Sequence, residues 1–205
     1  RIRAILSSPF PIARTIQAEA IIQFVTSSII PTPMSIYKEV RKIPAGSILS
    51  FRNGMLRVEP YWDVRFNGDS SRPEKEMAVA LRARFQESMA TCLGTTKDSG
   101  TGGAFLSGGV DSSAVTGMLT RILRHPVKSF SIGFQEDRFN EIGYARHAAR
   151  FYGTDHHEYF VSPGDALKAI PVLTEAFDEP HANSSAIPVY YCARLAKSHG
   201  VDFLF

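Results

Sequence analysis

The stretch Ala104-Phe-Leu-Ser-Gly-Gly-Val-Asp-Ser-Ser-Ala-Val-Thr-Gly-Met118 determines how the rest of the chain is interpreted. A short apolar run ends on two glycines, and apolar residues then return at helical spacing. The pattern predicts a strand, an anion-binding loop over residues 107–113 and a helix. Gly108 and Gly109 would let the backbone approach a bulky anion without interference from a Cβ atom. Three serine hydroxyls surround the same loop, from Ser107, Ser112 and Ser113.

The helix is expected to begin at Ser112 or Ser113, with its free N–H groups and the positive end of its dipole directed at the anion. The spacing is not that of the common phosphate loop G-x-x-x-x-G-K-[ST], and no lysine follows the glycines. The carboxylate of Asp111 would repel phosphates unless a cation lay between them. We therefore interpret Asp111 as a ligand of Mg²⁺, directly or through water. The alternative is a simple glycine turn in which Asp111 and Ser112 cap the helix.

The composition is that of an ordinary globular protein, with 44% hydrophobic and 21% charged residues in a chain of 205. A formal charge of +3, without a basic block, does not favour a nucleic-acid partner. Two cysteines, Cys92 and Cys192, are consistent with a reducing cytoplasm. No apolar run is long enough for a membrane span or a signal peptide, so we expect a cytoplasmic protein without a membrane partner. The chain begins without methionine, which suggests that it starts inside a longer protein.

The N-terminal part is expected to form a small α+β segment over residues 1–66, followed by a polar linker that begins at residue 67. Its expected elements are a strand at 1–6, helices at 17–26 and 35–41, and a β-hairpin over 47–60. Asn53-Gly54 predicts the hairpin turn, because both residues tolerate positive φ. Trp62 is expected to pack in a core.

Residues 67–205 are expected to form an α/β domain in which strands alternate with helices, as in a parallel sheet with helices on both faces. The expected strands are 103–106, 128–134 and 156–161, and the expected helices between them are 112–124 and 140–152. A helix with Ser71 and Glu74 at capping-box spacing precedes them, and a loop is expected at 93–103. A capped helix after Ser162, a helix at 186–199 ended by Gly200, and the start of a strand at 201 follow. A ligand should lie at the carboxyl ends of the strands.

Two groups of polar residues outside the loop are further candidates for binding a substrate or a metal ion. Asp178 and Glu179, one turn after Glu175, would help to hold Mg²⁺ or the substrate amine, or else form a solvated acidic helix end. His156 and His157 are neighbours on a strand and therefore point to opposite faces. We do not expect these two histidines to share a metal site.

The string Ser107-Gly-Gly-Val-Asp-Ser112 resembles the pyrophosphate-binding loop of the ATP pyrophosphatases, which cleave ATP between its α and β phosphates and adenylate a substrate. Further blocks resemble the synthetase domain of bacterial glutamine-dependent asparagine synthetases, and together they cover most of the chain from Ile36 onward. These blocks are Ile36-Tyr-Lys-Glu-Val-Arg-Lys-Ile-Pro-Ala-Gly46, Tyr61-Trp-Asp63, Ser129-Phe-Ser-Ile-Gly-Phe134, Phe139-Asn-Glu141 with Tyr144-Ala-Arg146, and Gly153-Thr-Asp-His-His-Glu158.

The resemblance implies a fold like that of the adenine nucleotide alpha hydrolases, with ATP and Mg²⁺ as cofactors. It places adenine beside Leu106 and Ile132, adds Gly133 to the residues that bind the nucleotide, and gives Ser107 and Asp111 roles in catalysis. The implied reaction activates the side-chain carboxylate of aspartate as an acyl-adenylate with release of pyrophosphate, after which ammonia from glutamine forms the amide. A glutaminase domain in the full-length chain and a homodimer are the implied partners.

Two departures from the family pattern concern the ends of the chain. The family has a second glycine-rich and acidic motif directly after the strand that begins at Val201, and this chain ends before it, so we expect the fragment alone to be inactive. Residues 1–6 would be the tail of the glutaminase domain, and neither cysteine inherits that domain's nucleophile. Two alternatives remain open. One is an amidotransferase or β-lactam synthetase-like ligase acting on another carboxylate, and the other is a non-catalytic module that binds an adenine nucleotide.

Overall fold

The computed structural model describes residues 1–66, 68, 72–96, 101–136, 138 and 140–205. The chain forms two compact units, which are described separately below. Unit 1 comprises Arg1–Asp69 and Pro171–Ser184, and unit 2 comprises Ser70–Ile170 and Ser185–Phe205. Residues 171–184, which the sequence analysis assigned to the α/β domain, thus group with the N-terminal part of the chain.

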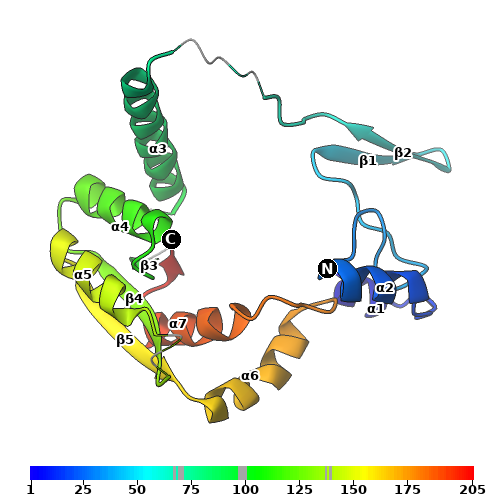
Figure 1. Cartoon of the computed structure of the whole chain (residues 1–205). Helices are drawn as coiled ribbons and strands as arrows, with labels where there is room; N and C mark the ends of the chain where they lie inside the picture. The colour runs from blue at the N-terminus through cyan, green and yellow to red at the C-terminus, as the bar shows by residue number, and fades with distance from the viewer. Residues whose placement is uncertain (67, 69–71, 97–100, 137, 139) are drawn as a thin grey trace. The chain divides into compact units, whose positions relative to one another are not determined.

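Unit 2 is built on a parallel sheet of four strands in the order β5-β4-β3-β6 (Figure 1). The strands are β3 (Gly102–Phe105), β4 (Lys128–Phe134), β5 (Asp155–Val161) and β6 (Phe203–Leu204). The N–H of Leu106 donates to the carbonyl of Phe130 at 2.9 Å, so the pairing of β3 with β4 continues one residue past β3. The predicted parallel sheet is confirmed.

Helices cover both faces of this sheet, as predicted (Figure 1). They are α3 (Glu74–Thr96), α4 (Val110–Leu123), α5 (Ile142–Tyr152) and α7 (Ala186–Ser198). Ala104 packs in a buried cluster with Met89, Met118 and Leu119 of α3 and α4, and Leu106 packs against α5. Phe130 packs on the other face, against Cys192 and Ala196 of α7.

Two helix ends in unit 2 differ from the sequence-based expectation. Helix α3 continues to Thr96, where a loop from residue 93 was predicted, because Leu93 packs against the cluster that α3 shares with α4. Helix α4 begins at Val110, because the extended Gly109 (φ −69°, ψ 165°) serves as its N-cap. Asp111 therefore lies in the first turn of the helix. Ser71 of the predicted capping box lies outside the described residues.

Unit 1 contains helices α1 (Ile2–Leu6) and α2 (Ala18–Ser27). The predicted strand at 1–6 is wrong, because the carboxylate of Asp178 accepts the N–H groups of Ile2 (2.8 Å) and Arg3 (3.4 Å) and so stabilises a helix N-terminus there. The predicted helix at 35–41 is also wrong. Tyr37 forms an isolated antiparallel bridge with Ile16 instead.

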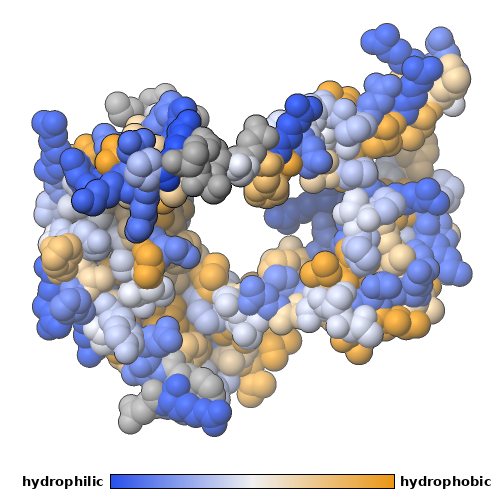
Figure 2. Space-filling view, turned by 45° about the horizontal axis from the view of Figure 1, so that its top comes forward, coloured by the Kyte–Doolittle hydropathy of each residue, from blue (hydrophilic) through white to orange (hydrophobic). Residues whose placement is uncertain are grey.

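The hairpin of unit 1 is confirmed, with β1 (Ser47–Arg52) paired antiparallel to β2 (Met55–Pro60). Asn53 and Gly54 at its turn have φ values of 51° and 76°. Trp62 is 62% exposed, so its predicted burial is wrong. Most apolar side chains of the hairpin are likewise exposed. Figure 2 shows hydrophobic and hydrophilic residues interspersed over the visible face of the molecule.

Helix α6 (Pro163–Ala176) contains the boundary between the two units and begins with the predicted cap. The Ser162 hydroxyl donates to the Asp165 carboxylate at 2.7 Å, and the N–H of Asp165 donates back to that hydroxyl at 3.1 Å. Gly200 (φ +71°) follows α7 at its C-terminal end. Among the described residues, every helix is too short or too polar to cross a bilayer.

Candidate functional site

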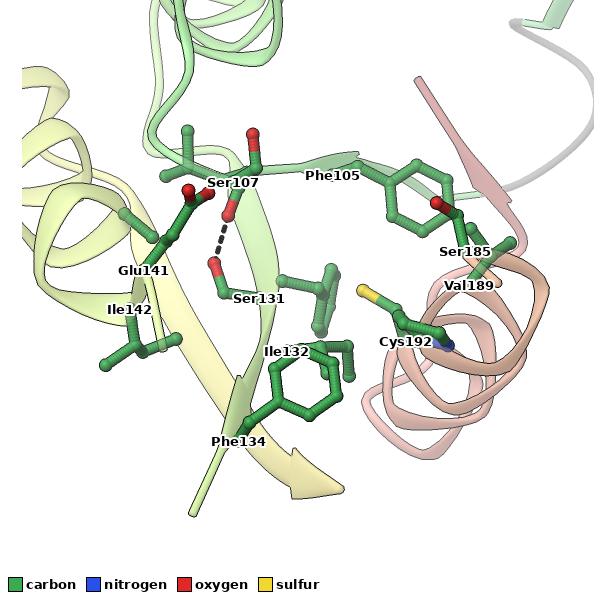
Figure 3. A pocket seen from close by; sticks show the side chains of 14 residues that line it. Phe105, Ser107, Ser131, Ile132, Phe134, Glu141, Ile142, Ser185, Val189 and Cys192 are labelled. Carbon is green, nitrogen blue, oxygen red and sulfur yellow. Dashed lines mark hydrogen bonds between the residues drawn. The ribbon is translucent and has the colours of Figure 1, made fainter. Parts of the chain in front are cut away.

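A pocket of about 380 Å³ lies in unit 2 at the carboxyl ends of β3 and β4 (Figure 3). Parallel α/β sheets bind their ligands at this edge. Each surrounding element contributes residues: the end of β3 and the loop after it, β4, the start of α5, and one face of α7. The lining residues are Phe105, Leu106, Ser107, Phe130, Ser131, Ile132, Phe134, Glu141, Ile142, Ala145, Ser185, Pro188, Val189 and Cys192.

The pocket is mainly apolar, with a few polar groups at one side. Leu106 is only 1% exposed, and its carbonyl oxygen accepts a hydrogen bond from the buried Ser131 hydroxyl. In Figure 3 the carboxylate of Glu141 lies near Ser107, whereas Ile132 and Phe134 lie toward α7. Such a pocket suits a planar apolar ring with a polar end.

The loop after β3 is held in shape by its own hydroxyl groups. The oxygens of Ser107 and Ser112 lie 2.8 Å apart. The Ser112 hydroxyl also accepts the N–H of Ser107 (3.1 Å), and the Ser107 hydroxyl accepts the N–H of Gly109 (3.2 Å). The N–H groups of the first turn of α4 have no acceptor within the helix. The loop thus presents a preformed turn and a helix N-terminus, both suited to an anion.

The two glycines of this loop differ in what the fold requires of them. Gly108 has φ +84°, and a Cβ atom there would lie 2.4 Å from both the Ala145 nitrogen and the Tyr144 carbonyl carbon. Its small size is therefore needed for packing against α5, independently of any role in binding a ligand. Gly109 has an ordinary φ of −69°, and the nearest atom to an added Cβ would be the Ser107 hydroxyl at 3.3 Å.

Asp111 is exposed, and within the described part of the chain its carboxylate has no hydrogen-bond or ion-pair partner. The described residues include no group of three His, Cys, Asp or Glu side chains that could hold a metal ion. Mg²⁺ is commonly held by one or two carboxylates together with substrate phosphates and water. A single free carboxylate beside an anion loop fits that ligand set.

The structure brings Leu106, Ser107 and Ile132 together in one pocket. The remaining loop residues named from the sequence line the adjoining turn and the start of α4 and do not line the pocket: Gly108, Gly109, Asp111, Ser112 and Ser113. Gly133 is buried in β4 beside Phe160, whose ring would lie 2.6 Å from an added Cβ. Gly133 does not line the pocket, so its role toward a ligand stays a prediction.

The wall formed by α7 and the acid at the start of α5 were not predicted from the sequence. Residues 185, 188, 189 and 192 follow one another at i, i+3, i+4 and i+7 spacing, so they share one face of α7. That spacing was available in the sequence, but it does not show which sheet the face covers. Glu141 was noted only within a resembling block, and its place at the pocket comes from the start of α5 after β4.

The acidic residues Asp178 and Glu179 have partners within unit 1. Asp178 accepts the first N–H groups of α1, as described above. Glu179 accepts the N–H of Ile36 at 2.8 Å and pairs with the Lys42 ammonium at 2.7 Å. Both carboxylates are thus engaged by their own chain, unlike a solvated helix end, and their role toward a substrate stays a prediction.

Ionisable groups in unit 2 have clear structural causes for their pKa values. Burial raises the pKa of Cys192 to about 12, so the thiol in the pocket is neutral at physiological pH and a poor nucleophile. Burial also lowers the pKa of His156, whose Nδ1 lies 2.8 Å from the Ser129 hydroxyl. His157 lies on the opposite face and contacts His199, with ring centroids 3.9 Å apart and ring planes tilted by 36°. The two neighbouring histidines thus lie on opposite faces of β5, as the alternation of a strand predicted.

Comparison with known proteins assigns the family. The model of the asparagine synthase family matches residues 80–205, which is more than half of the chain. Asparagine synthetase [glutamine-hydrolyzing] 1 of Bacillus subtilis is 28% identical over 200 residues, covering 93% of this chain and 31% of that protein. Putative asparagine synthetase [glutamine-hydrolyzing] 2 of Methanocaldococcus jannaschii is 28% identical over 192 residues, covering 89% of this chain and 35% of that protein. The chain thus spans about a third of the length of these relatives.

One solved structure, that of an NMN synthetase from Francisella tularensis, aligns with a TM-score of 0.40 and 13% identity, covering 59% of this chain and 52% of that one. This similarity is too low to bear on function. The family match, however, spans the strand, the serine-glycine loop and the helix that form the pocket edge. The chain belongs to the asparagine synthase family.

Proposed function

We propose that this chain carries the nucleotide-binding part of an ATP-dependent amide ligase of the asparagine synthetase type. The observation that carries the proposal is the pocket that holds Leu106 and Ile132 and ends on Ser107, the first residue of the anion loop. A purine would occupy the apolar part of this pocket, and its phosphates would follow the loop toward the start of α4. The family relationship supports the same assignment.

The adenine ring would lie between Leu106 and Ile132, where the backbone groups at the end of β4, including those of Gly133, can recognise its edge. A volume of about 380 Å³ accommodates a purine and its ribose. The apolar walls exclude water from the ring, and the polar groups of Ser107 and Glu141 lie where the nucleotide would leave the pocket.

The phosphates would bind along residues 107–113. The hydroxyl groups of Ser107, Ser112 and Ser113 and the first N–H groups of α4 would stabilise negative charge on the departing pyrophosphate. Gly108 and Gly109 would keep side chains away from it. Asp111 would hold Mg²⁺, which when bound neutralises phosphate charge.

In the proposed reaction, a side-chain carboxylate oxygen of aspartate attacks the α-phosphorus of ATP. The bond from that phosphorus to the bridging oxygen breaks, and pyrophosphate leaves with the bridging oxygen. Ammonia, released from glutamine by the glutaminase domain of the full-length protein, then attacks the acyl carbon. AMP departs with the oxygen that linked it to the acyl group, and the nitrogen loses a proton to form the neutral amide.

The test is release of pyrophosphate by the full-length protein in the presence of Mg²⁺, ATP and aspartate. We expect release to require both ATP and aspartate, and we expect Asp111→Asn to lower its rate by about 10²-fold, since charge stabilisation at such sites contributes on that order. Glu76→Gln is the matched control: it also removes one exposed carboxylate, on α3, outside the pocket. Its rate should equal that of the unmodified protein.

Other results would lead to different conclusions. Turnover with another carboxylic acid but not with aspartate would favour an amidotransferase or β-lactam synthetase-like ligase. Binding of ATP without pyrophosphate release, for every acid offered, would favour a non-catalytic nucleotide module. An unchanged rate in Asp111→Asn would contradict the metal role of that residue.

A further inference from the structure

A second pocket, of about 430 Å³, lies in unit 2 and shares no lining residue with the proposed nucleotide pocket. It is formed by the fifth residue of β5, the first half of α6 and one side of α7. Its lining residues are Tyr159, Asp165, Lys168, Tyr190, Tyr191, Arg194, Leu195 and Ser198. Three tyrosines, two cations and one acid thus line one concavity.

Among the described residues, the two cations of this pocket form no close ion pair with a carboxylate, although the charge of Lys168 helps to lower the pKa of Asp165. Within the described part of the chain, neither Arg194 nor Lys168 forms an ion pair. The guanidinium carbon of Arg194 lies 5.6 Å from the ring centroids of both Tyr190 and Tyr191. Contact with two rings orients the guanidinium group but leaves the hydrogen-bonding edge of its fork unused.

The one acid of the pocket, Asp165, caps α6 and also interacts with Tyr159 and Lys168. One carboxylate oxygen of Asp165 accepts both the N–H of Ser162 (3.0 Å) and its hydroxyl (2.7 Å), which caps α6. Two cations and one carboxylate leave the pocket with a net charge of one positive unit. A ligand with a single negative charge would balance it.

The aromatic walls are held in place without a ligand. Tyr159 and Tyr191 are stacked, with centroids 5.4 Å apart and planes 9° apart, and Tyr190 meets Tyr191 edge-on at 5.1 Å. The Tyr191 hydroxyl donates to the carbonyl of Asp165 at 2.8 Å, which ties α7 to the start of α6. A preformed aromatic surface reduces the entropy lost when a planar ring binds.

We propose that this pocket binds a small aromatic carboxylate. Arg194 holds the carboxylate group through its planar fork, Lys168 adds a second positive charge, and the ring of the ligand packs against the tyrosines. The proposal concerns a site apart from the nucleotide pocket and does not depend on the ligase reaction.

The experiment measures binding of 4-hydroxybenzoate to the full-length protein by isothermal titration calorimetry. Acetate, which lacks the ring, and phenol, which lacks the charge, are the comparison probes. We expect saturable binding of 4-hydroxybenzoate that is at least about tenfold tighter than that of either comparison probe. Excess ATP should leave the affinity unchanged.

Variants of Arg194 and of an arginine outside the pocket distinguish binding in this pocket from a general effect of charge on affinity. Arg194→Gln should weaken binding at least about tenfold. Arg194→Lys should weaken it less, because it keeps the charge but loses the fork. Arg150→Gln, an exposed arginine on α5 outside the pocket, should bind as the unmodified protein does. Circular dichroism of each variant checks the fold, and Arg194→Lys replaces Arg194→Gln in the comparison if the latter does not fold.

Three results would overturn the proposal. The first is absence of saturable binding of 4-hydroxybenzoate to the unmodified protein. The second is equal affinity in the Arg194 variants and the Arg150 control. The third is displacement by ATP, which would place the probe in the nucleotide pocket.

Discussion

Gly108 belongs to the predicted anion-binding loop and also packs against α5, so this residue affects both the loop and the fold. Its φ of +84° lies in the left-handed region, and backbone atoms of Tyr144 and Ala145 occupy the space of a side chain. The nearby Ser107 and Ser112 hydroxyls close the loop through hydrogen bonds within it. A change at Gly108 should therefore affect stability even when no ligand is bound.

We predict that Gly108→Ala lowers the free energy of unfolding by more than about 2 kcal/mol, since positive φ costs about 1 kcal/mol and the close backbone contact adds to it. Urea denaturation followed by circular dichroism measures the change. Gly143→Ala, on the α5 helix, is the matched control, because nothing lies within 4 Å of an added Cβ there. That control should raise stability by about 0.5–1 kcal/mol. Equal effects in the two variants would show that Gly108 is not constrained by packing.

At the scale of elements, a bidentate ion pair joins α5 to β5. The Arg146 Nε and an Nη donate to the two carboxylate oxygens of Glu158 at 2.8 and 2.7 Å. These hydrogen bonds lower the pKa of Glu158 below its usual value. A carboxyl whose pKa is lower in the folded state stabilises the fold above its unfolded pKa, and this contribution is lost as pH falls through the folded pKa.

We therefore predict that Glu158→Gln lowers the urea midpoint at pH 7, and that the difference from the unmodified protein disappears as the pH falls from about 5 to below the folded pKa of Glu158. Urea titrations between pH 3 and pH 7 measure this. Glu87→Gln is the control, because its pair with Arg84 on α3 is largely exposed and should contribute little at any pH. If the urea midpoints of Glu158→Gln and of the unmodified protein differed by the same amount at every pH, the charge of Glu158 would not be the source of its stabilising effect.

The helices and strands also show which local sequence signals were sufficient to predict where an element begins or ends. The period of β4 predicted its ends as observed, and Asn53-Gly54 predicted the hairpin turn, because both signals depend only on neighbouring residues. The end of α3 and the start of α4 were predicted less well. Leu93 stays helical because it contacts another helix, and Gly109 caps α4 because its backbone is extended. Neither helix end can be predicted from the spacing of neighbouring residues.

At the scale of the whole molecule, each unit is assembled from two separate parts of the sequence. In unit 1, residues 171–184 join the N-terminal part through Asp178 and Glu179. The pair of Glu179 with Lys42 is mostly buried, with the side chains 20% and 28% exposed. The Glu179 carboxylate also accepts the N–H of the buried Ile36. Its loss would leave the N–H of Ile36 without its acceptor and the Lys42 ammonium without its carboxylate, with only the Ile30 carbonyl (2.8 Å) as a partner among the described residues.

We predict that Glu179→Gln lowers the stability of unit 1 by about 2 kcal/mol, because it removes the charge from a mostly buried pair. The single tryptophan, Trp62, lies in unit 1, so its fluorescence during urea denaturation reports on that unit. Glu175→Gln, an exposed neighbour without this pair, is the control and should change the midpoint little. A loss of pyrophosphate release with no loss of stability would instead indicate that Glu179 acts on the substrate.

The sequence by itself determined the order of strands and helices in unit 2, the hairpin turn of unit 1, and the loop of residues 107–113 at the end of a strand. These features depend on hydrophobic period, on glycine positions and on capping residues, all of which act over a few neighbouring residues. The placement of Leu106 and Ile132 in one pocket came from the family resemblance, and it agrees with their positions at strand ends, since the carboxyl ends of adjacent parallel strands meet at one edge.

Only the tertiary structure decided which residues, distant in the sequence, contact these elements. Residues 2–6 are helical because Asp178, far along the chain, accepts their first N–H groups. Cys192 lines the proposed nucleotide pocket and Arg194 the second pocket because α7 packs along the sheet and beside α6. Contacts between residues distant in sequence stabilise these arrangements, and local spacing contains no information about which distant residue will supply the contact.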